Sequence, residues 1–286
     1  MKLACFSDIH GNLIAFKAAL ADAMMRGARR FLVAGDAVTD YPQSAEILDL
    51  IQREEMQMVL GNREIYCLNY HADDAKREEA FAYPQNRPLK FTYDRLSDDH
   101  FVYMESLPHE LVIDLGGKRL RVCHHSPGKK HWHLHPTINE EHVVTVMESI
   151  DEDILVVGHH HEGAAKMYGD KLFFNPGSVG VNWSGAFIAD YGMLEYDDGK
   201  LTYTLHHVPY DGGMLLRVCN QSGLMDEPAC AFWTWINLKM QTAGADAFNG
   251  FFALASEIKK TRGCDSPYIP QDIWDEAAAI HKQKYE

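Results

Sequence analysis

Short apolar runs alternate with segments of helical periodicity at the start of the chain. The runs 2–6, 31–34 and 56–60 predict buried strands, and the segments 13–24 and 44–51 between them carry apolar residues at helical spacing. Strands that alternate with helices in this way indicate a parallel sheet. The first part of the chain therefore predicts an α/β fold.

The pattern changes further along the chain. The stretch 65–107 is charged and weakly periodic, which indicates an inserted helical excursion rather than a sheet. Hairpins and single strands follow it, and from about residue 211 onward the pattern is helical. We therefore expect a main domain at 1–210 and a C-terminal helical extension at 211–286. The individual elements expected are hairpins at 111–122, 164–174 and 186–208, a strand at 154–157, and helices at 139–150, 232–243, 248–260 and 273–284.

The extension is rich in aromatic residues and methionine. Two interpretations are open for it: a cap packed on the core, which we favour, and a cofactor site. The first interpretation predicts that the extension is dispensable for the chemistry at a minimal substrate and matters for stability or substrate choice.

Composition narrows the class of protein. The net charge of -14 argues against a surface for nucleic-acid polymers, because such surfaces are basic. No apolar run approaches the 18 or so residues that a membrane span needs, so we expect no membrane association. The six cysteines are scattered without paired spacing, which indicates reduced thiols and a cytoplasmic protein.

Polar side chains stand at the ends of the first three predicted strands. Asp8 and His10 follow the first strand, Asp36 follows the second, and Asn62 follows the third. In parallel sheets, ligands bind outside the carboxyl ends of the strands. A single acid after a strand marks only a turn or a helix cap, but the repetition over three strands predicts a shared site.

Histidines stand at two later strand ends. His124 follows the predicted hairpin, and His159 and His161 follow the strand 154–157. Alternate side chains of an extended segment point to the same side, so His159 and His161 can reach one space while His160 points elsewhere. Neutral imidazole is the commonest metal ligand among side chains, so these residues extend the predicted site.

Two acids, one amide and four imidazoles are too many for one tetrahedral ion. They suit two divalent ions that share a bridging carboxylate, and the N/O donor set without thiolate fits Mn, Fe, Zn, Ni or Co, of which we favour Mn. Two ions about 3.5–4 Å apart can supply an activated hydroxide and clamp a phosphoryl group. The seven candidate ligands are Asp8, His10, Asp36, Asn62, His124, His159 and His161.

In their order along the chain, these motifs resemble the calcineurin-like metallophosphoesterases. The segment 175–178, Asn-Pro-Gly-Ser, strengthens the resemblance to one branch of this family, which contains the YfcE-like phosphodiesterases and the bacterial diadenosine-tetraphosphate phosphatases. The resemblance covers about residues 1–210. It implies a four-layer αββα sandwich of two mixed sheets, followed here by the helical extension.

The resemblance also implies roles for single residues. Asp8, His10 and His161 would hold the first ion and Asp36 would bridge, while the second ion would be completed by Asn62, His124 and His159.

The third motif departs from the family pattern, because Arg63 stands where the family has a histidine that binds phosphate and protonates the leaving group. Arginine stays charged, so we expect Arg63, beside Asn62, to bind phosphoryl oxygens rather than donate a proton. His125 or a metal-bound water would then protonate the leaving group. The alternative for Arg63 is an ion pair with Glu64 or with an acid on the surface.

The predicted function is hydrolysis of phosphate esters or anhydrides of a small substrate, such as a phosphodiester, a nucleotide or a dinucleoside polyphosphate. The alternatives are a protein Ser/Thr phosphatase and a non-catalytic scaffold on the same fold, since fold alone does not decide function. A scaffold has no need of all seven ligands, so we favour the enzyme. The substrate, the oligomeric state and the role of His131, His133 and His135 stay open; the three histidines could form another metal site or a polar loop.

Overall fold

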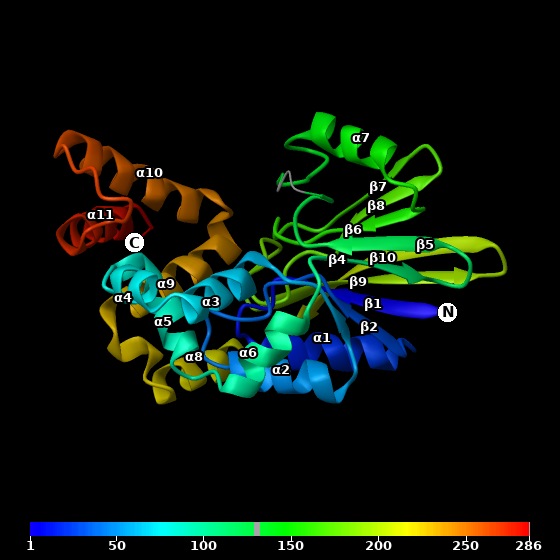
Figure 1. The fold of residues 1–286 in the computed structure, drawn as a ribbon, viewed down its shortest axis with the longest axis horizontal. Coiled ribbons are helices and arrows are strands. Elements are labelled where there is room, and N and C mark those ends of the chain that lie inside the picture. Colours follow the sequence, from blue (N-terminus) through cyan, green and yellow to red (C-terminus); the bar gives the residue numbers. More distant parts are fainter. Residues whose placement is uncertain (129–131, 286) are drawn as a thin grey trace.

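The computed structural model describes residues 1–128 and 132–285 and contains two five-stranded mixed sheets (Figure 1). The strands of the first sheet, in spatial order, are β10 (Lys200–Pro209), β9 (Ile188–Asp197), β1 (Lys2–Phe6), β2 (Arg30–Val33) and β3 (Gln57–Met58). Those of the second are β4 (Glu110–Asp114), β5 (Arg119–Cys123), β6 (Ile154–Val156), β8 (Lys171–Asn175) and β7 (Ala164–Tyr168). Within them, β1, β2 and β3 are parallel, as are β5, β6 and β8.

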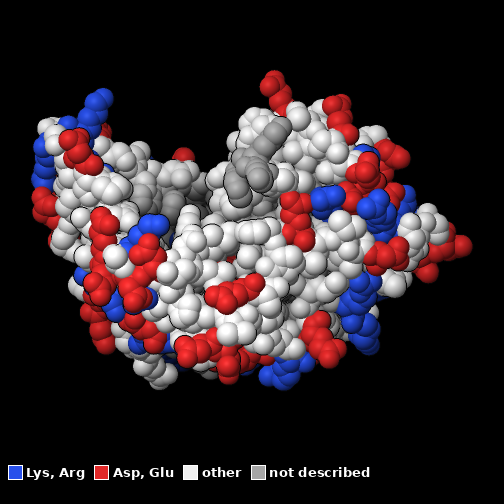
Figure 2. Space-filling view, viewed as in Figure 1, with Lys and Arg blue, Asp and Glu red and all other residues white. Residues whose placement is uncertain are grey.

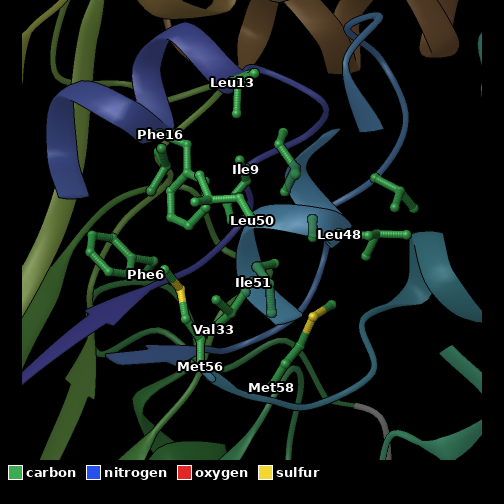
Figure 3. Close-up of a cluster of buried hydrophobic side chains, with 14 of the residues drawn as sticks. Phe6, Ile9, Leu13, Phe16, Val33, Leu48, Leu50, Ile51, Met56 and Met58 are labelled. Atoms are coloured by element: carbon green, nitrogen blue, oxygen red, sulfur yellow. The ribbon is translucent and has the colours of Figure 1, made fainter. Parts of the chain in front are cut away.

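Successive side chains of a central strand point to opposite faces of its sheet, and this alternation explains the order of the layers. In β1, Leu3 and Cys5 face the second sheet, whereas Ala4 and Phe6 face the helices on the opposite side (Figure 3). Those helices are α1 (Leu13–Met25) and α2 (Ser44–Arg53), and α7 (Glu140–Ser149) covers the outer face of the second sheet. The order helix, sheet, sheet, helix is the αββα sandwich that the resemblance implied, so the fold prediction is confirmed.

The segment between β3 and β4 is helical, as its charged and weakly periodic sequence indicated. It contains α3 (Asn62–Ala72), α4 (Asp74–Phe81), the 3-10 turn η1 (Pro84–Asn86), α5 (Arg87–Tyr93) and α6 (Asp98–Ser106). The chain after β10 contains α8 (Gly212–Gln221), the turn η2 (Leu224–Asp226), α9 (Pro228–Ala243), α10 (Asp246–Thr261) and α11 (Gln271–Tyr285). No helix of the described chain is long and apolar enough to cross a membrane.

The C-terminal helices have an apolar core of their own, centred on Phe251 and Trp274. A second cluster joins them to the sandwich, because Leu215 and Cys219 of α8 pack with Tyr41 and Val181. In Figure 1 these helices lie beside α3 to α5, at the end of the sheets where β1 and β2 terminate. The extension therefore lies next to the edge where the candidate ligands were predicted.

Candidate metal centre

The carboxyl ends of the parallel strands of both sheets meet at this edge. Four residues there have a left-handed backbone although none is glycine: Asp8, His10, Asp36 and His159, with φ of 52, 51, 53 and 67°. Such residues are held in place only by surrounding structure, and they concentrate at functional sites. The unfavourable backbone at these four positions therefore indicates that the direction of their side chains matters for function.

Asp8, His10 and His161 form one compact group. His161 Nε2 lies 3.4 Å from Asp8 Oδ1 and 3.3 Å from His10 Nε2. His10 Nε2 is 3.8 Å from Asp8 Oδ1 and 3.9 Å from Asp36 Oδ2. Two neighbouring residues after β1 and one residue after β6 therefore point their donor atoms at one space that Asp36 borders.

A second group lies on the other side of Asp36. His124 Nε2 is 3.3 Å from Asp36 Oδ2 and 3.2 Å from Asn62 Oδ1. The ring of His159 stands edge-on to that of His124, with centroids 5.2 Å apart. Asp36 Oδ2 thus borders both groups, as the prediction of a bridging carboxylate requires.

The outward nitrogens of three of these imidazoles have partners outside the centre. His124 Nδ1 lies 2.7 Å from the carbonyl of Ala34, and His161 Nδ1 lies 2.6 Å from that of Val181. His10 Nδ1 lies 3.0 Å from Asp40 Oδ2, in a bent contact that is an electrostatic pairing rather than a regular hydrogen bond. A proton on Nδ1 leaves the Nε2 lone pair facing the centre, which is how ligating histidines are oriented.

These donors fit metal ions. Ligand atoms about 2.1 Å from one ion are about 3 Å apart, close to the separations within the two groups. Asp8 Oδ1 is buried and has no hydrogen-bond partner among the described residues, which is costly unless something else binds it. Asp8, His10 and His161 suit one ion, and Asp36, Asn62, His124 and His159 suit a second.

The pKa values reflect the concentration of carboxylates and imidazoles. Burial raises the pKa of Asp8 and Asp36, but neighbouring histidines outweigh burial and bring both pKa values below the usual range. Burial lowers the pKa of His10, but Asp40 and the other acids raise it to about 10; Asp36 likewise raises the pKa of His124 to about 9. A metal ion bound here would compete with these protons, because a ligating imidazole must be neutral.

Glu64 organises the loops of the centre, which the sequence did not reveal. Its buried carboxylate accepts hydrogen bonds from the backbone N–H groups of Asp36, Ala37, Val38 and Gly61 at 2.8–3.2 Å. A Cβ on Gly61 would lie 2.2 Å from Asp36 Oδ1, so only glycine allows this approach. The only signal in the sequence was the acid three residues after Gly61, the spacing of a capping box.

Arg63 lies at the mouth of the centre. Its backbone N–H donates to Asp36 Oδ1 at 2.8 Å, and its Nη2 lies 3.6 Å from Asp40 Oδ2. Asp40 is only 4% exposed, so the arginine is paired neither with Glu64 nor with an acid on the surface. Burial lowers the pKa of Arg63, but the carboxylates of Asp40 and Asp36 raise it by more than burial lowers it. The pKa therefore lies above its usual value, and the guanidinium stays charged.

His125 packs against two candidate ligands. Its ring is 4.8 Å from that of His124 and 4.1 Å from that of His159, and it lines a cavity of about 390 Å³ that also includes Ile65 and His109. Arg63 lines a different cavity, which opens onto the centre. The catalytic roles expected for Arg63 and His125 stay predictions.

His133 and His135, the two described histidines of the loop before α7, contact different neighbours. His133 Nε2 lies 3.1 Å from His159 Nε2, whereas His135 stacks on His160 with centroids 4.1 Å apart and an interplanar angle of 18°. Nearly parallel stacked imidazoles cannot direct their in-plane lone pairs at a common ion. Burial lowers the pKa of His160 to about 3, so it packs as a neutral ring. His131 lies outside the described residues.

A cavity of about 380 Å³ opens onto the centre. His10, His161 and Arg63 line one side of it, and Met240 of α9 and Phe248 of α10 line the other. Figure 2 shows a recess in the surface between α10 and the α7 side, and acidic residues scattered over this face of the molecule. The extension, which holds no candidate ligand, thus forms a wall of the site.

Comparison with known proteins agrees with the family resemblance and with the fold described above. The family model described as the calcineurin-like phosphoesterase superfamily domain matches residues 1–199. A crystal structure of a metallophosphoesterase from Sphaerobacter thermophilus is 24% identical, with a TM-score of 0.62 over 78% of this chain and 95% of that one. A hypothetical protein from Pyrococcus horikoshii OT3 is 19% identical, with a TM-score of 0.70 over 81% of this chain and 97% of that one. These two structures show the shared fold. No curated protein matches the sequence.

Proposed function

Because the chain belongs to the calcineurin-like phosphoesterase superfamily and is a metal-dependent phosphoester hydrolase, we propose that it uses two divalent ions to cleave a small phosphorylated substrate. The observation that supports two ions is Asp36 Oδ2, which lies 3.9 Å from His10 Nε2 and 3.3 Å from His124 Nε2. One carboxylate thus borders two sets of donors. Manganese is the ion we favour for this mixed N/O set.

Two ions at such a site lower the pKa of bound water and neutralise charge on a phosphoryl group. The chain supplies the rest. Arg63 can hold two phosphoryl oxygens in its planar fork, and Asp40 beside it holds the guanidinium at the cavity mouth. Asn62 would bind both metal and substrate, because it lies between Arg63 and His124.

The substrate we propose is a phosphodiester, a nucleotide or a dinucleoside polyphosphate. A cavity of about 380 Å³ has the size of a small-molecule site, and the net charge of -14 disfavours a nucleic-acid polymer. Arginine cannot protonate a leaving group near neutral pH. We therefore expect phosphoanhydrides and aryl esters, whose leaving groups need no proton, to react faster than alkyl diesters.

The test combines metal content with turnover. Protein reloaded with Mn²⁺ should contain two ions per chain and should hydrolyse bis-p-nitrophenyl phosphate, p-nitrophenyl phosphate or a dinucleoside polyphosphate. Asp36→Asn should lose both properties, whereas the matched change Asp170→Asn, in an exposed hairpin turn, should lose neither. Two ions without turnover on any substrate would favour the scaffold, and one ion or none would overturn the two-metal mechanism.

A further inference from the structure

A tryptophan of the C-terminal extension is connected to the metal centre through one carboxylate. Trp233 Nε1 donates a hydrogen bond of 2.9 Å to Asp40 Oδ1, and the other oxygen of Asp40 lies 3.0 Å from His10 Nδ1. The same oxygen lies 3.6 Å from Arg63. Asp40 therefore faces a candidate metal ligand, a candidate phosphate-binding arginine and a residue from the end of the chain.

The loop that carries Asp40 needs support. Thr39 and Asp40 are consecutive residues with left-handed φ of 74 and 70°, which is unfavourable for both. The backbone of Tyr41 donates to the carbonyl of His10 at 3.0 Å, which ties the loop to the strand end beside it. Among the described residues, the side chain of Asp40 accepts a hydrogen bond from Trp233, and this bond orients the carboxylate.

Trp233 is itself rigidly held. It is 5% exposed, its ring lies parallel to that of Trp274 at 6.4 Å, and Phe248 stands edge-on to it at 5.4 Å. The guanidinium of Arg63 lies 5.8 Å from the centroid of the Trp233 ring, within reach of a cation–π attraction. One side chain of the extension thus contacts both Asp40 and Arg63.

We propose that Trp233 is a positioning residue: through Asp40 it sets the orientation of the His10 imidazole and the place of the Arg63 guanidinium, and it makes the extension part of the metal centre. This inference rests on the proposed function. Carboxylates that orient a ligating histidine change metal affinity about 10–100-fold when removed. Trp233 acts one step further out, so we expect an effect near the lower end of that range.

The test uses the full chain and Mn²⁺. Trp233→Phe keeps an aromatic ring for Trp274, Phe248 and Arg63 but removes the N–H, so only the contact with Asp40 is lost. We expect its Mn²⁺ affinity, measured by calorimetric titration, to fall on the order of 10-fold, with kcat/KM falling at sub-saturating metal and recovering in part when metal is in excess. Trp235→Phe is the matched control, because Trp235 is on the same helix and contacts Phe232 and Tyr285 instead of the centre.

A double-mutant cycle separates a positioning effect of Trp233 from a general loss of stability. If Trp233 acts through Asp40, Trp233→Phe should have little further effect on Mn²⁺ affinity in an Asp40→Asn background. Thermal unfolding of the metal-free protein should show that Trp233→Phe and Trp235→Phe both stay folded, with the larger shift for Trp233→Phe, because the buried Asp40 loses its hydrogen-bond donor. Wild-type Mn²⁺ affinity in Trp233→Phe, or full additivity with Asp40→Asn, would overturn the inference. Failure of the wild-type protein to bind two ions would instead overturn the proposed function.

Discussion

The αββα sandwich and the C-terminal extension contribute to the site in different ways. The sandwich carries every candidate ligand: Asn62 is the first residue of α3, and the others lie in the segments directly after β1, β2, β5 and β6, so the candidate ligands follow from the topology of the sheets. The extension carries none, yet it forms a wall of the cavity and donates to Asp40 from Trp233. We therefore expect the sandwich to hold the metal ions and the extension to affect metal affinity and the choice of substrate.

The difference changes what we expect from the extension. The absence of ligands predicted that residues after 211 are dispensable at a minimal substrate, and that prediction has not been tested. The contact between Trp233 and Asp40 gives a physical reason against full independence, because removing the extension would leave a buried carboxylate beside His10 without its hydrogen-bond donor. The predictions below address the two regions separately, starting with the largest effect.

The largest effect should come from the sandwich, at the shared carboxylate. Asp36→Ala removes an oxygen that borders both groups of donors and takes one negative charge away from His124 and His10. We expect hydrolysis to fall to the background rate and most of the metal to be lost, as measured by elemental analysis after reloading. An Asp36→Ala protein that keeps two ions would show that the donors of the two groups suffice without a bridge.

The second largest effect should come from Arg63, which lies where the sandwich and the extension meet. Arg63→Ala should keep both ions but lower kcat/KM on the order of 10²-fold, as the loss of one preorganised donor does in other enzymes. Arg63→Lys should restore only part of the rate, because a point charge lacks the fork. Unchanged kcat/KM in Arg63→Ala on the best substrate would leave Arg63 as a partner of Asp40 alone.

The sequence predicted the strands and the candidate ligands because both depend on short-range patterns, whereas the αββα sandwich was implied by the family resemblance. Apolar runs mark the strands, and a strand end is a local feature, so Asp36 and His124 could be named without knowing which strands pair. The same reasoning missed α8, where two glycines at the start, Gly212 and Gly213, obscure a helix that the Asp211 side chain caps at Met214 N. It also overestimated β3, which is paired over only two residues.

The contacts that hold the ligands could not be predicted. Asp40 and Trp233 are 193 positions apart in the sequence and meet only because α9 packs against the loop after β2. The sequence offered Glu64 only as an ion-pair partner of Arg63, yet Glu64 is buried and accepts hydrogen bonds from four backbone N–H groups. Such contacts depend on tertiary packing, which leaves no periodicity in the chain.

A third prediction measures how strongly the sandwich depends on a buried ion pair. Glu152 is 1% exposed and accepts hydrogen bonds from Arg121 at 2.9 and 3.1 Å and from Arg119 at 2.9 Å. Glu152→Gln should lower the free energy of unfolding by about 1.5–3 kcal/mol at pH 7, as hydrogen bonds to charged groups do. Urea unfolding followed by far-UV circular dichroism measures it.

The pH dependence of that loss follows from the pKa of Glu152. Hydrogen bonds from Arg121 lower this pKa in the folded state. A lowered pKa means that the contribution is fully present above the unfolded value of about 4.3 and disappears as the pH falls through the folded pKa. The difference between wild type and Glu152→Gln should therefore be constant from pH 7 to about pH 5 and shrink below it. A difference that grows on acidification would contradict the assignment.

The smallest effect should come from the ion pairs of the extension. Arg262 pairs with Asp272 and Glu276, but its side chain is 42% exposed and those of the acids are 70% and 42% exposed. Exposed pairs contribute about 0–1 kcal/mol, because water screens them and two long side chains must be ordered. Glu276→Gln should therefore change the free energy of unfolding by less than about 1 kcal/mol, and 0.5 M salt should remove most of the change. Tryptophan fluorescence suits the measurement, because Trp233, Trp235 and Trp274 all lie in the extension. A loss of unfolding free energy as large as that of Glu152→Gln would mean that ion pairs stabilise the extension as much as they stabilise the sandwich. The position of Trp233 beside Asp40 would then depend on those ion pairs as well as on the aromatic core around Trp274.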